Sequence, residues 1–149
     1  MIVSTRVDNR LIHGQVVQGW LPNLDVSEVL VVSPLAVKTV FMQKMFRLAL
    51  PSGYKLKVMD AKEAVAYVQQ SGEKLFLVIE SVAVLFQMLQ AGFNPKLITL
   101  GNTQFEKGKK QCSPGVFLSD EELKELKGLA SKGITVVMRA LPSSLASKL

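Results

Sequence analysis

Histidine and cysteine are almost absent from this chain of 149 residues, which contains one of each, His13 and Cys112. A lone cysteine cannot form an internal disulfide, and one histidine with one cysteine does not make a cluster of metal ligands. We therefore expect no metal site and no other cofactor site. The low cysteine content is also typical of proteins that work in a reducing compartment such as the cytoplasm.

Long hydrophobic runs are absent as well. The longest apolar stretch, "VLVVSPLAV" (29–37), is interrupted by Ser33 and Pro34 and falls far short of the roughly 18 residues that a membrane helix needs. The first residues, "MIVSTRVDNR", place polar side chains after three apolar ones, which does not match a secretory signal. We expect a cytoplasmic protein with no segment inserted in a membrane.

The chain is nevertheless rich enough in apolar residues to build a core. Hydrophobic residues make up 48% of it and charged residues 20%, which predicts one packed domain over residues 1–149. The net charge of +6 is compatible with three kinds of partner: a nucleic acid, an anionic membrane face or an acidic protein.

Short apolar runs alternate with helical patterns along the whole chain. The predicted strands are 2–7, 28–32, 55–59, 75–79, 96–100, 116–119 and 134–140, and the predicted helices are 14–21, 37–50, 60–72, 81–92 and 119–133. Residues 101–115 are predicted to form a long polar loop. This alternation indicates an α/β fold with an open, mostly parallel, twisted sheet and helices on both faces, in which an edge strand can be antiparallel.

The aromatic side chains provide the main argument against nucleic-acid binding. Phe41, Phe46, Phe76 and Phe86 occupy positions typical of a core rather than positions beside lysines, and no nucleic-acid motif is present. In the predicted helix 37–50, apolar residues recur with helical spacing at Val37, Val40, Phe41, Met45 and Leu48. Trp20 is expected to pack the first helix against the sheet.

The most informative stretch is "RVDNRLIHGQV" (6–16), which follows the first predicted strand. Neutral imidazole is a nucleophile, and Asp8 is suited to accept its other N–H and fix its tautomer. Arg6 and Arg10 could neutralise a phosphoryl group, and a helix start offers further N–H donors. Residue types alone also allow a purely structural interpretation, in which His13 has no chemical role, the arginines are surface charges and Asp8 is a turn residue.

Longer segments resemble one known family. "RVDNRLIHGQVVQGW" (6–20) is similar to the signature of the IIB component of the mannose/fructose/sorbose family of the bacterial sugar phosphotransferase system (PTS). "FRLALPSGYKLKV" (46–58), "LGNTQFEKGKKQCSPGVFLSDEEL" (100–123) and "GITVVMRALP" (133–142) resemble later segments of the family in the same order. The likeness therefore extends over nearly the whole chain.

This resemblance implies a cytoplasmic phosphotransferase component with an open α/β sheet. His13 would accept a phosphoryl group through Nδ1 from the phosphohistidine of a IIA protein or domain. It would then pass the group to a sugar bound by the membrane components IIC and IID. Arg10 would bind the phosphoryl oxygens, Asp8 and Arg6 would bind or support the site, and Gly14 would allow close approach of the backbone. A homo-oligomer is compatible with this role.

The sequence departs from the family pattern at three places around the expected site. Asn9 replaces the second aspartate of the motif, Ser33 and Pro34 replace an aspartate-rich turn, and "GNTQF" (101–105) replaces a more glycine-rich segment. These differences leave phosphocarrier chemistry intact but bear on partner choice and on transport. Two alternatives therefore stay open: a regulatory phosphoprotein of an incomplete system, and a module that binds an anion or nucleic acid without phosphotransfer.

Several further residues are candidates for the same pocket. Asn9, Gln15, Ser33, Ser81 and Asn102 are expected near the carboxyl ends of strands, where ligands bind in open α/β sheets. Each has an ordinary structural interpretation as a helix cap or turn residue. Lys107, Lys109 and Lys110 form the densest basic patch, which could steer an acidic partner or simply be solvated. Cys112 is expected to be a passive thiol.

Overall fold

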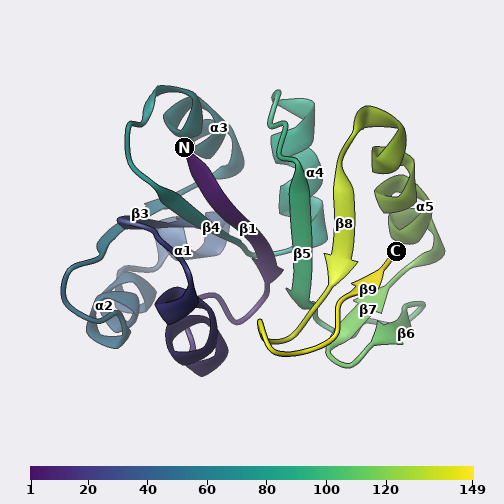
Figure 1. Cartoon of the computed structure of the whole chain (residues 1–149), viewed down its shortest axis with the longest axis horizontal. Helices are drawn as coiled ribbons and strands as arrows, with labels where there is room; N and C mark the ends of the chain where they lie inside the picture. Colours follow the sequence, from purple (N-terminus) through teal and green to yellow (C-terminus); the bar gives the residue numbers. More distant parts are fainter.

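The computed structural model describes all 149 residues and has a seven-stranded sheet at its centre (Figure 1). Its strands, in spatial order, are β3 (Lys55–Met59), β2 (Glu28–Val32), β4 (Leu75–Ile79), β1 (Ile2–Asp8), β5 (Leu97–Asn102), β8 (Thr135–Met138) and β9 (Ser147–Lys148). All neighbouring strands are parallel except β9, which pairs antiparallel with β8 at one edge. The predicted α/β fold is confirmed, with its antiparallel edge strand.

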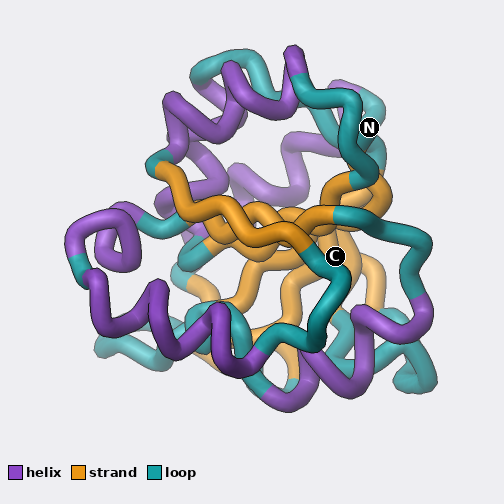
Figure 2. The backbone as a smooth tube through the Cα atoms, turned by 90° about the vertical axis from the view of Figure 1, so that its left-hand side faces the viewer, coloured by secondary structure: helices purple, strands orange, loops and turns teal.

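Helices cover both faces of this sheet, as Figure 2 shows with the strands between two helical layers. One layer contains η1 (Gln15–Trp20), η2 (Leu21–Asn23), α1 (Pro34–Lys38) and α2 (Val40–Ala49); the other contains α3 (Ala61–Gln70), α4 (Val82–Gln90), α5 (Asp120–Gly128) and η3 (Leu129–Lys132). Every residue of β2 and β4 is buried because both of their faces are covered. This explains why these strands are apolar without alternation.

The predicted helix starts on the second layer are confirmed in detail. The side chains of Asp60, Ser81 and Ser119 each accept a hydrogen bond from the backbone N–H three residues later, which caps α3, α4 and α5. Glu122 also accepts from the backbone N–H of Ser119 and completes a capping box. The first helix differs in its winding, because η1 is a π-helix rather than an α-helix.

The prediction of a single helix over 37–50 is wrong, because an extended residue, Thr39, interrupts the helix. Thr39 has extended backbone angles, φ −120° and ψ 92°, and separates α1 from α2. The hydroxyl of Thr39 donates to the carbonyl of Leu35, and the side-chain amide of Gln43 donates to the carbonyl of Ala36. These bonds satisfy carbonyl groups that a continuous helix would have bonded itself.

The apolar spacing in this segment does not mark the core. Val40, Phe41 and Leu48 are 65%, 70% and 80% exposed, and Val37 and Met45 also lie on the surface. The buried side of α2 is formed instead by Phe46, with Leu50 just after the helix and Met42 packed beside them. The prediction that Phe41 belongs to the core is therefore wrong, whereas Phe46 and Phe76 are buried as expected.

The predicted polar loop 101–115 contains regular structure. β6 (Lys110–Ser113) pairs antiparallel with β7 (Val116–Leu118) in a small separate sheet. The turn between them contains Gly115, whose φ of +79° is in the left-handed region that glycine adopts without strain. The sequence pattern did not predict this hairpin, because β6 is a polar strand without the apolar residues that mark a buried one.

The carboxyl ends of four central strands lie at one edge of the sheet. Val7 of β1 and Val32 of β2 both pair with Ile79 of β4, and Asp8 pairs with Asn102 of β5. The segments that follow these strands therefore begin side by side, as expected for a ligand-binding edge. No helix has both the length and the apolar character needed to cross a membrane.

Candidate functional site

A tight turn places His13 at this edge. The backbone N–H of Leu11 donates to the carbonyl of Asp8 at 3.1 Å, and the N–H of Arg10 donates to Asp8 Oδ1 at 3.0 Å. Leu11 has a φ of +58°, which is unfavourable for a non-glycine residue, and its side chain is buried. Burial of this side chain holds the turn in its strained conformation, and such strain is concentrated at functional sites in proteins.

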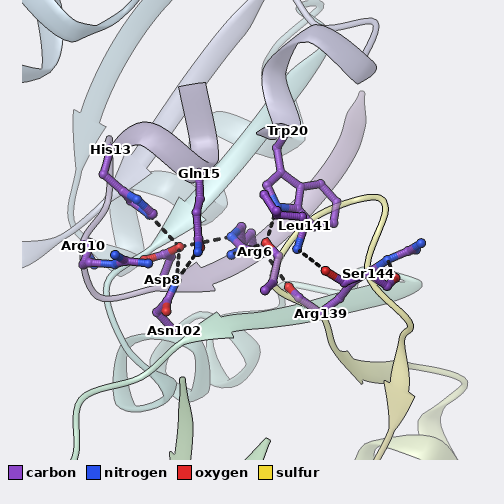
Figure 3. A network of polar contacts seen from close by, with 11 residues as sticks. Arg6, Asp8, Arg10, His13, Gln15, Trp20, Asn102, Arg139, Leu141 and Ser144 are labelled. Atoms are coloured by element: carbon purple, nitrogen blue, oxygen red, sulfur yellow. Dashed lines mark hydrogen bonds and ion pairs between the residues drawn. The ribbon is translucent and has the colours of Figure 1, made fainter. Parts of the chain in front are cut away.

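The imidazole of His13 is held by one of its two nitrogens. Its Nε2 lies 2.9 Å from Asp8 Oδ2 (Figure 3). Because the carboxylate accepts, Nε2 carries the proton and donates, so that in the neutral ring Nδ1 keeps a free lone pair. The side chain is 16% exposed, and no group of the chain hydrogen-bonds Nδ1. His13 thus has a fixed tautomer with Nδ1 left unbonded.

Asp8 is the centre of the network. Its side chain is fully buried, and Oδ2 also accepts from Arg6 Nε at 3.1 Å and from Asn102 Nδ2 at 3.0 Å. Burial by itself would raise the pKa of Asp8, but the hydrogen bonds from His13 and Asn102, with the charges of His13 and Arg6, lower the pKa overall. The carboxylate therefore stays ionised and keeps its orienting role at neutral pH.

This lowered pKa predicts a loss of stability in acid. A carboxylate with a depressed folded-state pKa stabilises the fold above its unfolded pKa of about 3.9, and this contribution disappears as the pH falls through the folded-state value. We expect the difference in free energy of unfolding between wild type and Asp8→Asn to be constant near neutrality and to shrink below about pH 4. Urea unfolding across this range measures it.

The control for this pH series is Asp25→Asn, which removes an exposed carboxylate that contacts only Lys74. This control separates the effect of losing the buried Asp8 network on the free energy of unfolding from the general effect of removing a negative charge. A difference for Asp8→Asn that persists undiminished in acid would contradict the assigned ionisation of Asp8.

Arg6 lies beneath the site and does not reach the surface. Its side chain is fully buried; Nη1 donates to the carbonyl of Arg139 at 2.8 Å and Nη2 to that of Ala140 at 3.0 Å. The guanidinium lies 4.9 Å from the ring centre of Trp20, whose indole N–H also donates to Ala140. Burial lowers the pKa of Arg6, and the neighbouring Asp8 carboxylate partly offsets this effect. Arg6 therefore supports Asp8, which is one of the two roles expected for it, and its burial leaves it no direct access to an incoming group.

Gly101 makes room for this guanidinium. The pairing of β1 with β5 shifts between Val7 and Asp8, so that Gly101 forms a bulge opposite them. A Cβ atom at residue 101 would lie 2.1 Å from Arg6 Cζ, far inside contact distance. The bulge and the missing side chain together admit the arginine into the sheet edge.

Arg10 and Gly14 are the predicted residues that lie open beside His13. Arg10 is exposed, and its guanidinium has no partner in the chain, so it is available to an incoming group. Gly14 lies at the start of η1 with nothing within 4 Å of where a Cβ would be. Asn9 is exposed and is held through its backbone by Asn102. The side chains of Arg10 and Asn9 form no hydrogen bond with Asp8 or His13, although the backbone N–H of Arg10 donates to Asp8.

The remaining pocket candidates separate into two groups. Asn102 joins the network: it donates to Asp8 and also to Gln15 Oε1 at 3.1 Å, which brings Gln15 to the site. Ser33 and Ser81 do not join it, since each hydroxyl caps a helix, and Ser33 also donates to Glu80 at 2.8 Å. Neither serine hydrogen-bonds Asp8 or His13, so a phosphate contact at these two residues stays a prediction.

The basic patch is largely neutralised by α5 and its surroundings. Lys109 lies 3.3 Å from Glu122 and 3.7 Å from Glu106, and Lys110 lies 2.9 Å from Asp120. Only Lys107 is left without an ion pair, so steering by this patch is weaker than the sequence suggested. Cys112 in β6 is half-buried and has no basic or imidazole group as a hydrogen-bond partner.

Two features of the site were not found from the sequence. The carbonyl groups of Arg139 and Ala140 could not be recognised as partners of Arg6, because every residue has a backbone carbonyl. Gly101 did leave a signal, since an isolated glycine at the end of a strand indicates a bulge or a close approach. No three His, Cys, Asp or Glu side chains lie together as metal ligands would.

Comparison with known proteins identifies the family of this chain. Residues 2–149 match the family described as PTS system sorbose subfamily IIB component. Over 95% of its length the chain is 26% identical to the N-acetylgalactosamine-specific phosphotransferase enzyme IIB component 1 of Escherichia coli K12, of which 91% is covered. It is 25% identical over 93% of its length to the mannose-specific EIIAB component of the same strain, of which 44% is covered.

Its fold is also that of a solved relative. The crystal structure of the N-acetylgalactosamine-specific IIB component 1 from Escherichia coli superposes with a TM-score of 0.92 at 24% identity, covering 100% of this chain and 99% of the other. The fold, the order of the motifs and the match over residues 2–149 lead to one conclusion. The chain belongs to the sorbose-subfamily IIB components of the bacterial sugar phosphotransferase system.

Proposed function

We propose that this IIB component is a cytoplasmic phosphocarrier that holds a phosphoryl group on Nδ1 of His13. It receives the group from the phosphohistidine of a IIA protein or domain and transfers it to a sugar bound by the membrane components IIC and IID. One observation carries the proposal: Asp8 binds Nε2 of His13 at 2.9 Å, and Nδ1 has no partner in the chain. The fixed tautomer provides a nucleophilic nitrogen without any proton transfer beforehand.

The transfer needs little chemistry beyond positioning. The Nδ1 lone pair forms a bond to phosphorus as the bond from phosphorus to the donor's imidazole nitrogen breaks. In the second step a sugar hydroxyl attacks phosphorus and gives its proton to solvent, the bond from phosphorus to Nδ1 breaks, and His13 leaves as a neutral imidazole. The buried carboxylate of Asp8 stabilises the positive charge that the phosphorylated ring carries, and it does so through the same Nε2 hydrogen bond.

The direct test is phosphorylation by a phosphorylated IIA protein followed by intact-mass measurement. We expect one phosphoryl adduct that is lost in acid, as expected of a phosphohistidine but not of a phosphoserine. Nitrogen and phosphorus NMR of the adduct should place the phosphorus on Nδ1. An adduct on Nε2 would contradict the assigned role of Asp8, and no adduct at all would contradict the proposed function.

Arg10→Gln is expected to slow the transfer without removing the acceptor. The exposed guanidinium lies in the turn next to His13 and has no competing partner, so it is free to bind the phosphoryl oxygens. Losing one such charged donor should lower the transfer rate on the order of 100-fold. Rapid-quench measurement of adduct formation gives the rate. Arg47→Gln, which removes an exposed arginine from α2, is the control.

A further inference from the structure

The outward face of α2 is apolar, which is unusual for a helix at the surface. Phe41, Met45 and Leu48 recur at i, i+4 and i+7 and are 70%, 48% and 80% exposed; we call them the α2 ridge. Phe46 and Met42 lie next to the ridge around the helix and pack on the sheet, so the apolar arc of α2 is wider than its buried part. The apolar arc of a surface helix normally faces the core along its whole width. Figure 1 shows α2 at the margin of the molecule, with no other element outside it.

Cationic side chains lie beside this ridge, and the segment around it in the sequence contains no acidic residue. No aspartate or glutamate lies between Glu28 and Asp60 in the sequence. Lys38 ends α1, and Lys44 and Arg47 lie on the exposed part of α2 beside the ridge. None of these three cations forms an ion pair within the chain. The surface therefore combines exposed aromatic and aliphatic groups with unpaired cations.

We infer that the α2 ridge docks on the surface of an anionic lipid bilayer. Helices that lie in a membrane interface combine Phe and Leu on one side with Lys and Arg beside them, and each cation gains from anionic headgroups. Docking of this kind is peripheral and leaves the fold unchanged. It does not depend on phosphorylation of His13.

Charge and hydrogen-bonding capacity favour lipid over the other occupants. Protein interfaces combine donors with acceptors and are depleted in lysine, whereas the exposed polar side chains of α2 are the cations Lys44 and Arg47. Two copies of the chain joined through this face would bring their unpaired cations together, and residues 29–59 contain no acid to balance them. An anionic bilayer supplies both the apolar layer and the negative charge.

Vesicle flotation of the full-length chain tests this inference. We expect binding to vesicles of phosphatidylcholine mixed with anionic phosphatidylglycerol, and little binding to phosphatidylcholine alone. Removing the two cations with Lys44→Gln/Arg47→Gln should weaken binding roughly 30-fold. Phe41→Ser/Leu48→Ser should weaken it at least about tenfold, because it removes most of the inserted apolar area.

Matched controls are available elsewhere on the surface. Phe105→Ser removes a phenylalanine that is 61% exposed, and Lys124→Gln/Lys127→Gln removes two exposed cations from α5. Both should leave vesicle binding unchanged, and urea unfolding should show that all variants fold. Equal binding to neutral vesicles, or equal loss in the controls, would overturn the inference. So would a dimer in solution that the ridge substitutions dissociate, or a ridge required for phosphotransfer from IIA without vesicles.

Discussion

Replacing His13 with glutamine is expected to abolish phosphorylation of the chain and leave its fold intact. Phosphorylation should cease because Nδ1 is the nucleophile that the site presents, and a glutamine amide has no comparable lone pair on nitrogen. The fold should persist because His13 is partly exposed, while Arg6 and Asn102 still bind the Asp8 carboxylate. Intact-mass measurement after incubation with phosphorylated IIA protein reports the first effect, and urea unfolding reports the second.

Cys112→Ala is the matched control for this experiment. A phosphocysteine would be the other nucleophilic route in this chain, but the Cys112 thiol hydrogen-bonds only a backbone carbonyl, that of Lys110. The alanine variant should therefore accept a phosphoryl group at the wild-type rate. A phosphoryl adduct that survives in His13→Gln and disappears in Cys112→Ala would show that the wrong nucleophile has been assigned.

Adding one methyl group at residue 101 should destabilise the protein by about 3–5 kcal/mol, which is typical of breaking a buried ion pair. In Gly101→Ala the new Cβ would lie 2.1 Å from Arg6 Cζ, so the guanidinium must move. It cannot move without losing hydrogen bonds to Asp8, Arg139 or Ala140, and it has no access to water. Urea unfolding measures the loss, and the rate of phosphorylation should fall with it.

Gly128→Ala is the control for this substitution. Gly128 ends α5 with a helical φ of −62° and has nothing within 4 Å of a Cβ, so alanine should be neutral or stabilising by up to about 1 kcal/mol. A double-mutant cycle locates the effect, because Gly101→Ala should cost much less in an Arg6→Ala background. A cost as large in that background would show that the methyl group clashes with something other than Arg6.

The sheet and the proximity of His13 to Asp8 could be predicted from the sequence, because both depend on local patterns. Continuous apolar runs such as "LFLVI" (75–79) mark strands covered on both faces, and serine and aspartate caps mark the helix starts. His13 and Asp8 lie within one short segment after a strand, so their proximity was expected. The structure adds which nitrogen Asp8 holds.

The long-range parts of the site could not be predicted in the same way. Whether an arginine in a strand faces solvent or interior depends on the room opposite it, and for Arg6 that room comes from a bulge at Gly101. The orientation of α2 was misjudged for a related reason. Its apolar arc is wider than the part that packs on the sheet, so periodicity alone could not tell which apolar residues are buried.

The buried arginine also has a consequence for the order of synthesis. Its carbonyl partners lie 133 and 134 residues later in the chain. At ribosomal rates of about 5–20 residues per second, the segment that contains His13 waits on the order of ten seconds for them. During that interval Arg6 lacks the two carbonyl groups that hold its guanidinium in place against Asp8. The buried network beneath His13 is therefore completed among the last features of the fold.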